Sequence, residues 1–439
     1  MESIAITPID HPLNSEIRVP GSKSLTNRAL LISALAGGTT RLTNALFSDD
    51  SRMFAGALQT LGFDVRLEPQ SAEMTVSGLG GHIPARKAEL FIGNAGTAAR
   101  FLSAFLTLGK GEYVLDGDAR MRERPIGDLV DALEQLGASV EPLYPPEGGR
   151  AFICPPIRIV ESGLRGGRAS IAGDISSQFL SALLMVAPYA QKPVELSLST
   201  ELNSKPYVDM TLAIMRDFGV ETERSGYQRF AVGKGRYRAQ ASYAIESDAS
   251  AASYFFAAPA ILGGHVRVEN ISRRSKQGDI AFLDVLRQMG CTIAEQANSI
   301  EVIGPHGVGR LLPNVLRGVD VDMRDIPDTA QTLAVIAPFA ASPTRIRGIA
   351  SARVKETDRI AATCAELARL GVVVEEHPDG LTIQPCASVR PASIRTYNDH
   401  RMAMAFALVG LRVPGVTIEN PDCVSKTFPD YFDVLEALR

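Results

Sequence analysis

The sequence predicts an α/β protein built from six copies of one helix and strand module. Two repeated patterns carry this prediction. A helix-like segment that ends in a large apolar residue and Gly, followed at once by a strand-like start, occurs as TLGFDV, QLGASV, DFGVET, QMGCTI and RLGVVV. An Ala-rich, mostly apolar helix pattern occurs six times and alternates with the first. Any α/β protein shows one or two such junctions, but this alternation along the whole chain indicates a true repeat.

The junction glycines recur at similar intervals. They are Gly62, Gly137, Gly219, Gly290 and Gly371, separated by 75, 82, 71 and 81 residues. Each is expected to follow a helix in the left-handed conformation, which Gly adopts at low cost. A sixth helix, over residues 429–438, ends the chain where a sixth such Gly would stand.

The Ala-rich helices are predicted to be buried, because they are apolar on most faces. We expect them over residues 23–36, 96–108, 176–188, 248–262, 328–340 and 399–411. A short strand of alternating polarity is predicted after each helix, over residues 40–46, 112–118, 194–200, 265–271, 344–350 and 416–422. One module therefore consists of a buried helix, a strand, a surface helix and further strands.

Composition excludes several classes of protein. The 439 residues are 45% hydrophobic and 21% charged with a net charge of −4, which is typical of globular proteins and argues against a general nucleic-acid binder. Five Cys without a C-x-x-C pair exclude a zinc ribbon and a redox dithiol. No signal peptide is evident, and the apolar stretch 251–262 is shorter than the ~18 residues of a membrane span. We therefore expect a soluble, cytoplasmic protein.

Positive charges stand near the predicted starts of the buried helices. The starts are GSKSLTNR, GNAGTAAR, DISSQ, ESDAS, IPDTAQ and YNDHR. Their Ser, Asp and Asn residues are typical N-caps, and capping explains about half of them. Capping does not explain the charges of Lys23, Arg28, Arg100 and Arg401, which oppose the helix dipole. A bound phosphate or carboxylate would offset this cost, so the helix starts indicate a pocket for a polyanionic small molecule.

Further cations stand at equivalent points of the repeat. They are found in residues 120–127 (Arg120, Arg122 and Arg124), in residues 353–360 and at Lys426. Each segment taken alone is more often a solvated basic turn or a surface ion pair, which contributes little stability. Nucleotide and hydrolase motifs are absent, since the Walker pattern fails at PGSKS, no G-x-G-x-x-G opens a helix and no G-x-S-x-G occurs.

Segments spread along nearly the whole chain resemble those of the enolpyruvyl transferases. They are PGSKSLTNRAL, GNAGTAAR, RMRERPIGDLVDAL, DISSQFLSALLM, SKPYVDMT, ESDASAASYF, IPDTAQTLAV, RVKETDRI, YNDHRMAMAFAL and SKTFPDYF. The combination is most similar to the 5-enolpyruvylshikimate-3-phosphate synthases (3-phosphoshikimate 1-carboxyvinyltransferases). The related UDP-N-acetylglucosamine enolpyruvyl transferases are the alternative; they usually carry a reactive Cys in the loop that corresponds to residues 112–124, where this chain has none.

This resemblance implies a two-domain fold in which each domain is an inside-out α/β barrel of three βαβαββ-type modules. One domain would comprise residues 1–20 and 245–439, and the other residues 21–244. The first strand would therefore belong with the C-terminal half, and the active site would lie in the cleft between the domains. We expect a monomer whose partners are small molecules only, with no nucleic acid and no membrane.

The resemblance also implies the reaction. The 5-hydroxyl of shikimate 3-phosphate adds to C2 of phosphoenolpyruvate while C3 is protonated, and phosphate then leaves the tetrahedral intermediate. The reaction belongs to the shikimate pathway, which leads to chorismate and the aromatic amino acids, and it needs neither a cofactor nor a metal. Glyphosate would compete with phosphoenolpyruvate, since sensitive members carry a Gly at the position of Gly96.

Site residues follow from the matching motifs. The contacts of shikimate 3-phosphate would be Lys23, Ser24, Arg28, Ser176, Ser177, Gln178, Ser204, Tyr207, Asp328, Lys355 and, more weakly, Ser351. Those of phosphoenolpyruvate would be Lys23, Asn94, Gly96, Arg124, Gln178, Arg359, Arg401 and Lys426. Asp328 would accept the hydroxyl proton, and Glu356 with Lys23 would handle protonation at C3. A carboxylate among cations stays ionised, so Asp328 would be ready to act as a base.

The chain departs from the family pattern at two places. The usual GNAGTAMRPL reads GNAGTAARFL, with Ala99 and Phe101, and the lost Pro changes how this helix start is set. Ser351 stands where relatives often have Asn, and its shorter side chain weakens one substrate contact. His400 is expected to be a structural residue at a helix start, with a proton relay as the alternative.

A protein of a different class stays open at this point. The same fold could serve a non-catalytic anion-binding protein. Such a protein would have no reason to keep Asp328 and Glu356 beside the cations, so the sequence favours the enzyme.

Overall fold

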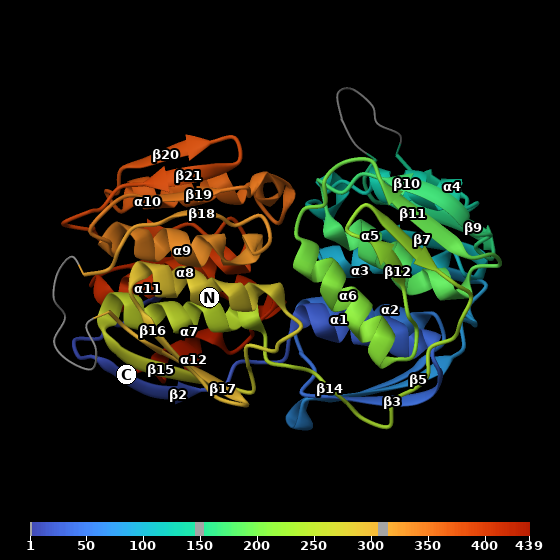
Figure 1. Ribbon diagram of the computed structural model, residues 1–439, viewed down its shortest axis with the longest axis horizontal. Helices are drawn as coiled ribbons and strands as arrows, with labels where there is room; N and C mark the ends of the chain where they lie inside the picture. Colours follow the sequence, from blue (N-terminus) through green and yellow to red (C-terminus); the bar gives the residue numbers. More distant parts are fainter. Residues whose placement is uncertain (1, 145–152, 306–314) are drawn as a thin grey trace. The chain divides into compact units, whose positions relative to one another are not determined.

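The computed structural model describes residues 2–144, 153–305 and 315–439, and the chain divides into two compact units (Figure 1). The split unit combines the residues up to Pro20 with Glu246–Arg439, and the continuous unit is Gly21–Ile245. Each unit has its own hydrophobic core. Ile245 belongs to the continuous unit, one residue beyond the boundary expected from the sequence, because its N–H donates to Thr43 O at 2.9 Å.

The second module of the continuous unit shows the repeated plan most plainly. It comprises β6 (Lys87–Phe91), α3 (Gly96–Leu106), β7 (Lys110–Asp116), α4 (Gly127–Gln135), β8 (Val140–Pro142) and β9 (Ile157–Ser162). Its four strands form a sheet in the order β6-β7-β9-β8, in which β6 and β7 are parallel and the other neighbours are antiparallel. This is the βαβαββ order expected from the sequence.

Two more modules complete the continuous unit. One comprises β14 (Tyr243–Ala244), α1 (Lys23–Leu35), β3 (Gly37–Thr43), α2 (Asp49–Thr60), β4 (Asp64–Glu68) and β5 (Glu73–Leu79). The other comprises β10 (Gly167–Ile171), α5 (Ser177–Val186), β11 (Val194–Leu198), α6 (Lys205–Asp217), β12 (Glu223–Ser225) and β13 (Arg229–Val232). Their sheets, β14-β3-β5-β4 and β10-β11-β13-β12, repeat the same strand order.

The split unit also contains three modules. The first comprises β2 (Leu13–Ile17), α7 (Ala249–Leu262), β15 (Gly264–Glu269), α8 (Phe282–Met289), β16 (Thr292–Glu295) and β17 (Ser299–Ile303). The second comprises β18 (Asp320–Asp322), α9 (Ala330–Ile336), β19 (Thr344–Arg347), α10 (Arg359–Arg369), β20 (Val374–His377) and β21 (Gly380–Ile383). The third comprises β22 (Ser393–Ile394), α11 (His400–Arg412), β23 (Thr417–Glu419) and α12 (Tyr431–Glu436), and its sheet is completed by the N-terminal β1 (Ser3–Ala5). The six predicted modules are thus confirmed.

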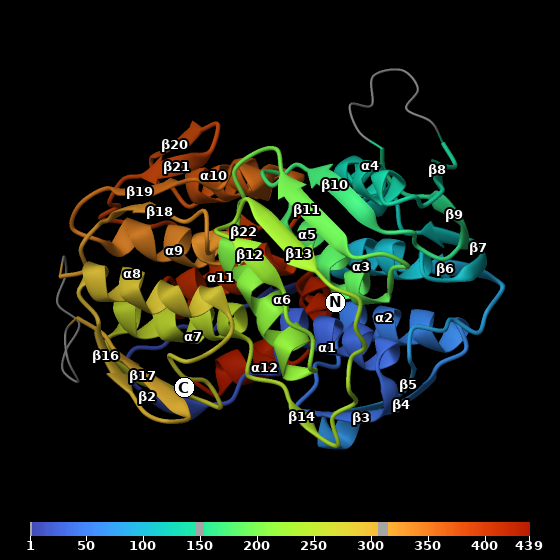
Figure 2. The same ribbon diagram turned by 45° about the vertical axis from the view of Figure 1, so that its right-hand side comes forward.

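The leading strands of two modules are exchanged between the units. Strand β2 precedes α1 in the chain, yet it pairs in parallel with β15 of the split unit. Strand β14 precedes α7, yet it pairs in parallel with β3 of the continuous unit. Figures 1 and 2 show this exchange by colour, since dark-blue β2 lies beside yellow strands and yellow-green β14 lies beside blue β3. The chain crosses twice, at residues 20–21 and 245–246.

The Ala-rich helices form the interior of each unit, as predicted. In the split unit every residue of α7 is buried, and α11 is buried from His400 to Leu411. The junction glycines all have positive φ, between 81° at Gly371 and 109° at Gly290. Helices α5 and α9 are shorter than expected, because each passes into a 3-10 turn that contains a proline, Pro188 or Pro338.

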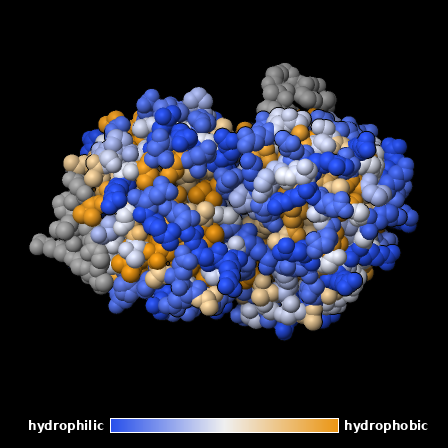
Figure 3. All heavy atoms as spheres, in the orientation of Figure 1, coloured by the Kyte–Doolittle hydropathy of each residue, from blue (hydrophilic) through white to orange (hydrophobic). Residues whose placement is uncertain are grey.

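The surface of the described residues mixes polar and apolar side chains. In Figure 3 hydrophilic residues cover most of the face shown, and hydrophobic residues reach it in scattered patches. Within residues 2–144, 153–305 and 315–439, no helix is both long enough and apolar enough to cross a membrane.

Candidate active site

Lys23 is the first residue of α1, next to the N-cap Ser22. Its ammonium opposes the dipole of this helix. Asp50, in the first turn of α2, brings a carboxylate oxygen within 3.3 Å of Lys23 Nζ. The Asp50 side chain is 4% exposed and that of Lys23 is 14% exposed. The charge at this helix start is therefore partly offset by the protein itself.

Arg28 lies one turn further along α1 and is 1% exposed. Its Nη1 donates to Ser24 O at 3.0 Å and its Nη2 donates to Tyr207 O at 3.2 Å. Its Nε donates to Thr211 Oγ1 at 2.7 Å. Burial lowers the pKa of Arg28 to about 10. The guanidinium thus ties α1 to α6 through the backbone carbonyls of two residues that were predicted to contact shikimate 3-phosphate.

The start of α3 brings three predicted residues together. Arg124 Nη1 donates to both Asn94 Oδ1 and Asn94 O, at 2.9 and 3.2 Å. A Cβ added at Gly96 would lie 2.5 Å from Arg124 Nη2. The guanidinium therefore packs against the bare Cα of Gly96, and the absence of a side chain there is a requirement of space rather than of turn geometry.

The start of α5 is joined to that of α3. Ser176 is the N-cap of α5, and its Oγ accepts the N–H of Gln178 at 3.3 Å. Gln178 Nε2 reaches Thr97 Oγ1 at 3.4 Å. Ser177 begins the helix and is 7% exposed. Ser176 therefore acts as a helix cap, which is one of the two roles that the sequence predicted for such residues. The side-chain amide of Gln178 extends toward α3.

Ser204 and Tyr207 lie at the start of α6. Ser204 has the left-handed φ of 56°, which a residue other than Gly adopts only when the surroundings hold it there. Its carbonyl accepts the N–H of Tyr207 at 3.0 Å. The carbonyls of Tyr207 and Ser24 both accept hydrogen bonds from Arg28.

Arg359 is the centre of a charged cluster in the split unit. It begins α10, and its side chain is 2% exposed. Its Nε donates to Asp399 at 2.7 Å, its Nη2 to Glu356 at 2.7 Å and its Nη1 to Asp328 at 3.2 Å. Burial alone would lower the pKa of Arg359, but the three carboxylates, with Asp399 the strongest, hold it well above the ordinary value.

Three other cations surround the same carboxylates. Arg401 Nη2 donates to Asp328 Oδ2 at 2.7 Å, and Lys355 Nζ lies 4.0 Å from Asp328 Oδ1. Lys426 Nζ lies 3.9 Å from Glu356 Oε1. All predicted site residues of the split unit except Ser351 therefore form one continuous network of ion pairs.

Two residues of the network are structural. Asp399 is fully buried, caps α11 by accepting the N–H of Arg401 at 2.9 Å, and clamps Arg359. His400 is 1% exposed, and its Nδ1 lies 3.5 Å from Asp399 Oδ1. This burial favours a structural role for His400 over a role as a proton relay. Ser351 lies half-buried in the 3-10 segment Ala350–Val354 and has no side-chain hydrogen bond in the described part of the chain.

The two clusters differ in what they can do. The continuous unit presents Lys23, Arg28 and Arg124 beside hydroxyl and amide groups, a combination suited to binding phosphate and carboxylate. The split unit presents the carboxylates of Asp328 and Glu356 among cations, a combination suited to proton transfer next to a bound anion.

A model of the EPSP synthase (3-phosphoshikimate 1-carboxyvinyltransferase) family matches residues 8–435. The chain belongs to this family. A curated relative from Nostoc punctiforme is 51% identical over 433 residues, which cover 98% of each chain. One from Marinomonas sp. is 48% identical over 439 residues, which cover 100% of each. Both are named 3-phosphoshikimate 1-carboxyvinyltransferase, so the family predicted from the sequence is confirmed.

Solved structures agree with this assignment. EPSP synthase from Acinetobacter baumannii superimposes with a TM-score of 0.79 at 26% identity, covering 99% of this chain and 98% of that chain. The enolpyruvyl transferase NikO from Streptomyces tendae gives a TM-score of 0.78 at 19% identity, covering 100% of this chain and 97% of that chain, and shares the fold. The α/β fold in two units is therefore that of the EPSP synthase family.

Sequence reasoning missed the residues that hold the charged groups in place. Asp50 was not singled out, although a carboxylate in the first turn of the next helix could have suggested a partner for Lys23. Thr211 and Ser181 lie within the matching segments SKPYVDMT and DISSQFLSALLM, but neither was singled out, because a buried hydroxyl looks like any other core position. Asp399 was recognised only as a helix cap, and its clamp on Arg359 joins residues 40 positions apart.

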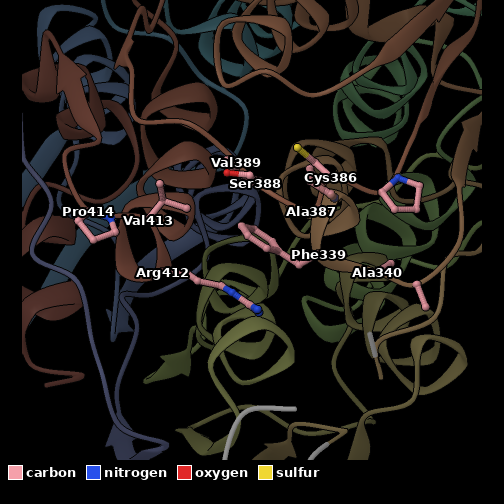
Figure 4. Close-up of a pocket in the computed structure, with 12 residues that line it drawn as sticks. Phe339, Ala340, Cys386, Ala387, Ser388, Val389, Arg412, Val413 and Pro414 are labelled. Atoms are coloured by element: carbon pink, nitrogen blue, oxygen red, sulfur yellow. The ribbon is translucent and has the colours of Figure 1, made fainter. Parts of the chain in front are cut away.

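The split unit has a cavity of about 550 Å³ away from the predicted site residues. It is lined by Phe339 after α9, by Arg412 at the end of α11 and by residues 385–389. Figure 4 shows the Arg412 side chain extending beneath the ring of Phe339, where the guanidinium carbon is 4.7 Å from the ring centroid. Arg412 Nη1 also donates to Ile261 O at the end of α7. Arg412 thus serves as a cap for the helix ends, which the negative end of the dipole favours.

Proposed function

We propose that the chain carries out the reaction named by its family, and that both clusters contribute residues to it. The enolpyruvyl group of phosphoenolpyruvate passes to the 5-hydroxyl of shikimate 3-phosphate, and phosphate is released. The observation that carries this assignment is the network around Arg359, in which two carboxylates suited to proton transfer stand beside four cations suited to holding anions. The match to the family over residues 8–435 supports it independently.

The residues have distinct roles in this reaction. Lys23, Ser24, Arg28, Ser176, Ser177, Gln178, Ser204, Tyr207, Lys355 and Ser351 hold shikimate 3-phosphate, and Lys23, Asn94, Gly96, Arg124, Gln178, Arg359, Arg401 and Lys426 hold phosphoenolpyruvate. Asp328 accepts the proton of the 5-hydroxyl. Glu356 and Lys23 protonate C3 and later remove a proton from it as phosphate leaves. Catalysis needs only positioning, charge stabilisation and proton transfer by side chains.

Burial and neighbouring cations have opposite effects on the protonation state of Glu356. Its side chain is 7% exposed, and such burial favours the neutral acid that could donate a proton. The guanidinium of Arg359 at 2.7 Å and the ammonium of Lys426 at 3.9 Å favour the carboxylate instead. An anionic substrate among these cations would weaken their hold on Glu356, so we infer that substrate binding prepares it as a proton donor.

The test is phosphate release on mixing the protein with both substrates. We expect phosphate from phosphoenolpyruvate plus shikimate 3-phosphate and none from phosphoenolpyruvate alone. Replacing shikimate 3-phosphate with UDP-N-acetylglucosamine should give none, because no Cys stands in residues 112–124. Binding of both substrates without phosphate release would favour a non-catalytic anion-binding protein. A cytoplasmic location and a monomeric state remain predictions from the sequence.

A further inference from the structure

Arg28 is a buried cation without an acidic partner. It is 1% exposed, and within the described part of the chain it forms no ion pair with a carboxylate. Burying an uncompensated charge is costly, and most buried arginines are paired with acids. Arg359 in the split unit follows that rule, with three carboxylates around it. Arg28 is held instead by neutral groups.

The groups that accept hydrogen bonds from the guanidinium come from three helices, α1, α5 and α6. Thr211 Oγ1 of α6 accepts from Arg28 Nε at 2.7 Å, and Ser181 Oγ of α5 accepts from Nη2 at 3.4 Å. The Thr211 hydroxyl lies 2.9 Å from both Ser181 Oγ and Tyr207 O, to one of which it donates. The carbonyls of Ser24 and Tyr207 accept two further bonds, so four of the five N–H groups of the Arg28 guanidinium donate hydrogen bonds. One N–H of Nη1 remains.

The aromatic ring of Phe101 also packs against the guanidinium of Arg28. Arg28 Cζ lies 5.2 Å from its centroid, and Phe101 is fully buried. An aromatic face stabilises a cation without neutralising it. Hydroxyls, carbonyls and a ring thus fix both the position and the plane of Arg28, and leave its full positive charge to act on a ligand.

We propose that Thr211 is a positioning residue for shikimate 3-phosphate. With Ser181 it orients Arg28 in a cage free of acids, so that the anionic substrate becomes the counter-ion of this arginine. Because the guanidinium is planar and its donors have a fixed geometry, the bond from Nε to Thr211 determines where the remaining Nη1–H points. The proposal rests on the proposed function, since it names the residue that prepares one of its substrate contacts.

The split unit offers a matched control. Ser253 of α7 and Thr332 of α9 form a hydroxyl pair at 2.9 Å, the same distance as between Ser181 and Thr211. All four side chains are fully buried. Among the residues that the structure describes, no arginine donates a hydrogen bond to the Ser253 and Thr332 pair. Valine has nearly the shape of threonine but lacks the hydroxyl. Replacing either threonine by valine therefore removes one buried hydroxyl, and the two variants should lose similar stability.

The experiment compares Thr211→Val, Thr211→Ser and Thr332→Val in the full chain. We measure KM for shikimate 3-phosphate, kcat and the melting temperature. Thr211→Val should raise KM for shikimate 3-phosphate about 10-fold, the effect of removing a hydrogen bond to a charged group, and change kcat less than about 3-fold. Thr211→Ser keeps the hydroxyl and should restore KM. Thr332→Val should lower the melting temperature as much as Thr211→Val does, without changing KM.

A second measurement tests whether Thr211 acts through Arg28. Calorimetry with shikimate 3-phosphate compares Thr211→Val, Arg28→Gln and the double variant. If Thr211 acts through Arg28, the double variant should bind no more weakly than Arg28→Gln. Additive losses, or an unchanged KM in Thr211→Val, would overturn the proposal. If Thr211→Val does not fold, Ser181→Ala replaces it, with Ser253→Ala as its control and a raised KM again expected.

Failure of the proposed function is distinguishable from failure of this inference. If the unaltered protein releases no phosphate from its two substrates, the proposed function is wrong. If it turns over normally while Thr211→Val and Thr332→Val have the same KM as the unaltered protein, only the role of Thr211 is wrong.

Discussion

The two units repeat one module plan, but they hold their buried arginines in opposite ways. In the split unit Arg359 contacts Asp328, Glu356 and Asp399. In the continuous unit the described partners of Arg28 are hydroxyls, carbonyls and an aromatic ring. Carboxylates among cations can move protons, whereas a cation held by neutral groups keeps its charge for a ligand. The comparison shows that two units of the same plan can hold a buried arginine either among carboxylates or among neutral groups.

Lys23 should give the largest effect, because it is the continuous-unit residue assigned to both substrates and to proton transfer. Lys23→Ala should lower kcat by at least about 10³-fold, roughly 4 kcal/mol of transition-state stabilisation. Circular dichroism should show an intact fold, and the melting temperature will report the stability lost with the ion pair to Asp50. Lys192→Ala, an exposed lysine of the same unit, is the control. Turnover near the unaltered rate in Lys23→Ala would remove this residue from the mechanism.

Asp328→Asn tests whether acid and base chemistry resides in the split unit. The amide cannot accept the hydroxyl proton, so kcat should fall about 10²- to 10⁴-fold, the usual contribution of a general base. The affinity for phosphoenolpyruvate, measured by calorimetry, should not weaken, because Arg359 and Arg401 lose a competing negative charge. A variant with normal kcat and weakened binding would make Asp328 a binding residue and blur the distinction between the units.

Gly96→Ala tests the anion site of the continuous unit. The added methyl would meet the Arg124 guanidinium at 2.5 Å, and this flexible side chain must move aside. The longer inhibitor glyphosate should lose more affinity than phosphoenolpyruvate, so the ratio of the inhibition constant to KM should rise. The unaltered enzyme should be inhibited competitively with phosphoenolpyruvate, as inhibition at several substrate concentrations will show. A loss of stability with an unchanged ratio would make Gly96 a purely structural residue.

Asp50→Asn sharpens the comparison, because the Asp50 carboxylate lies 3.3 Å from Lys23 Nζ within the continuous unit. The amide keeps the shape of the carboxylate but not its charge, so it should hold Lys23 less firmly. We expect kcat to fall about 10-fold, which is the usual effect of losing a hydrogen bond to a charged group. Asp64→Asn is the control, since the Asp64 carboxylate is 52% exposed and its ion pair with Arg66 should contribute little. Equal activity of the two variants would contradict a role for Asp50.

The smallest expected effect is a change in the radius of gyration of the protein when substrate binds. The cations assigned to substrate are divided between them, and like charges repel until an anion neutralises them. Saturating shikimate 3-phosphate should therefore reduce the radius of gyration measured by solution scattering. Inorganic sulfate at the same concentration is the control for ionic strength. An unchanged profile at saturation would show that substrate binding does not draw the units together.

The sequence by itself determined the repeat and the buried helices, and its motifs proposed the site residues. Gly62, Gly137, Gly219, Gly290 and Gly371 marked the helix ends because a left-handed residue there is a local requirement, and each has positive φ. Lys23, Arg28 and Arg401 stood out because a cation at a helix start is locally unfavourable. The motif matches assigned the family because they recur along the whole chain.

Only the tertiary structure decided what surrounds those charges. Asp399 and Arg359 are 40 positions apart, and Arg28 and Thr211 are 183 apart, yet each pair is in hydrogen-bond contact. No local pattern distinguishes Thr211 from Thr332, because both are buried threonines on helices, yet the hydroxyl of Thr211 accepts a hydrogen bond from an arginine and that of Thr332 pairs with Ser253. Helix ends and capping depend on a few neighbouring residues, whereas the partner of a buried charge depends on which helices the fold brings together.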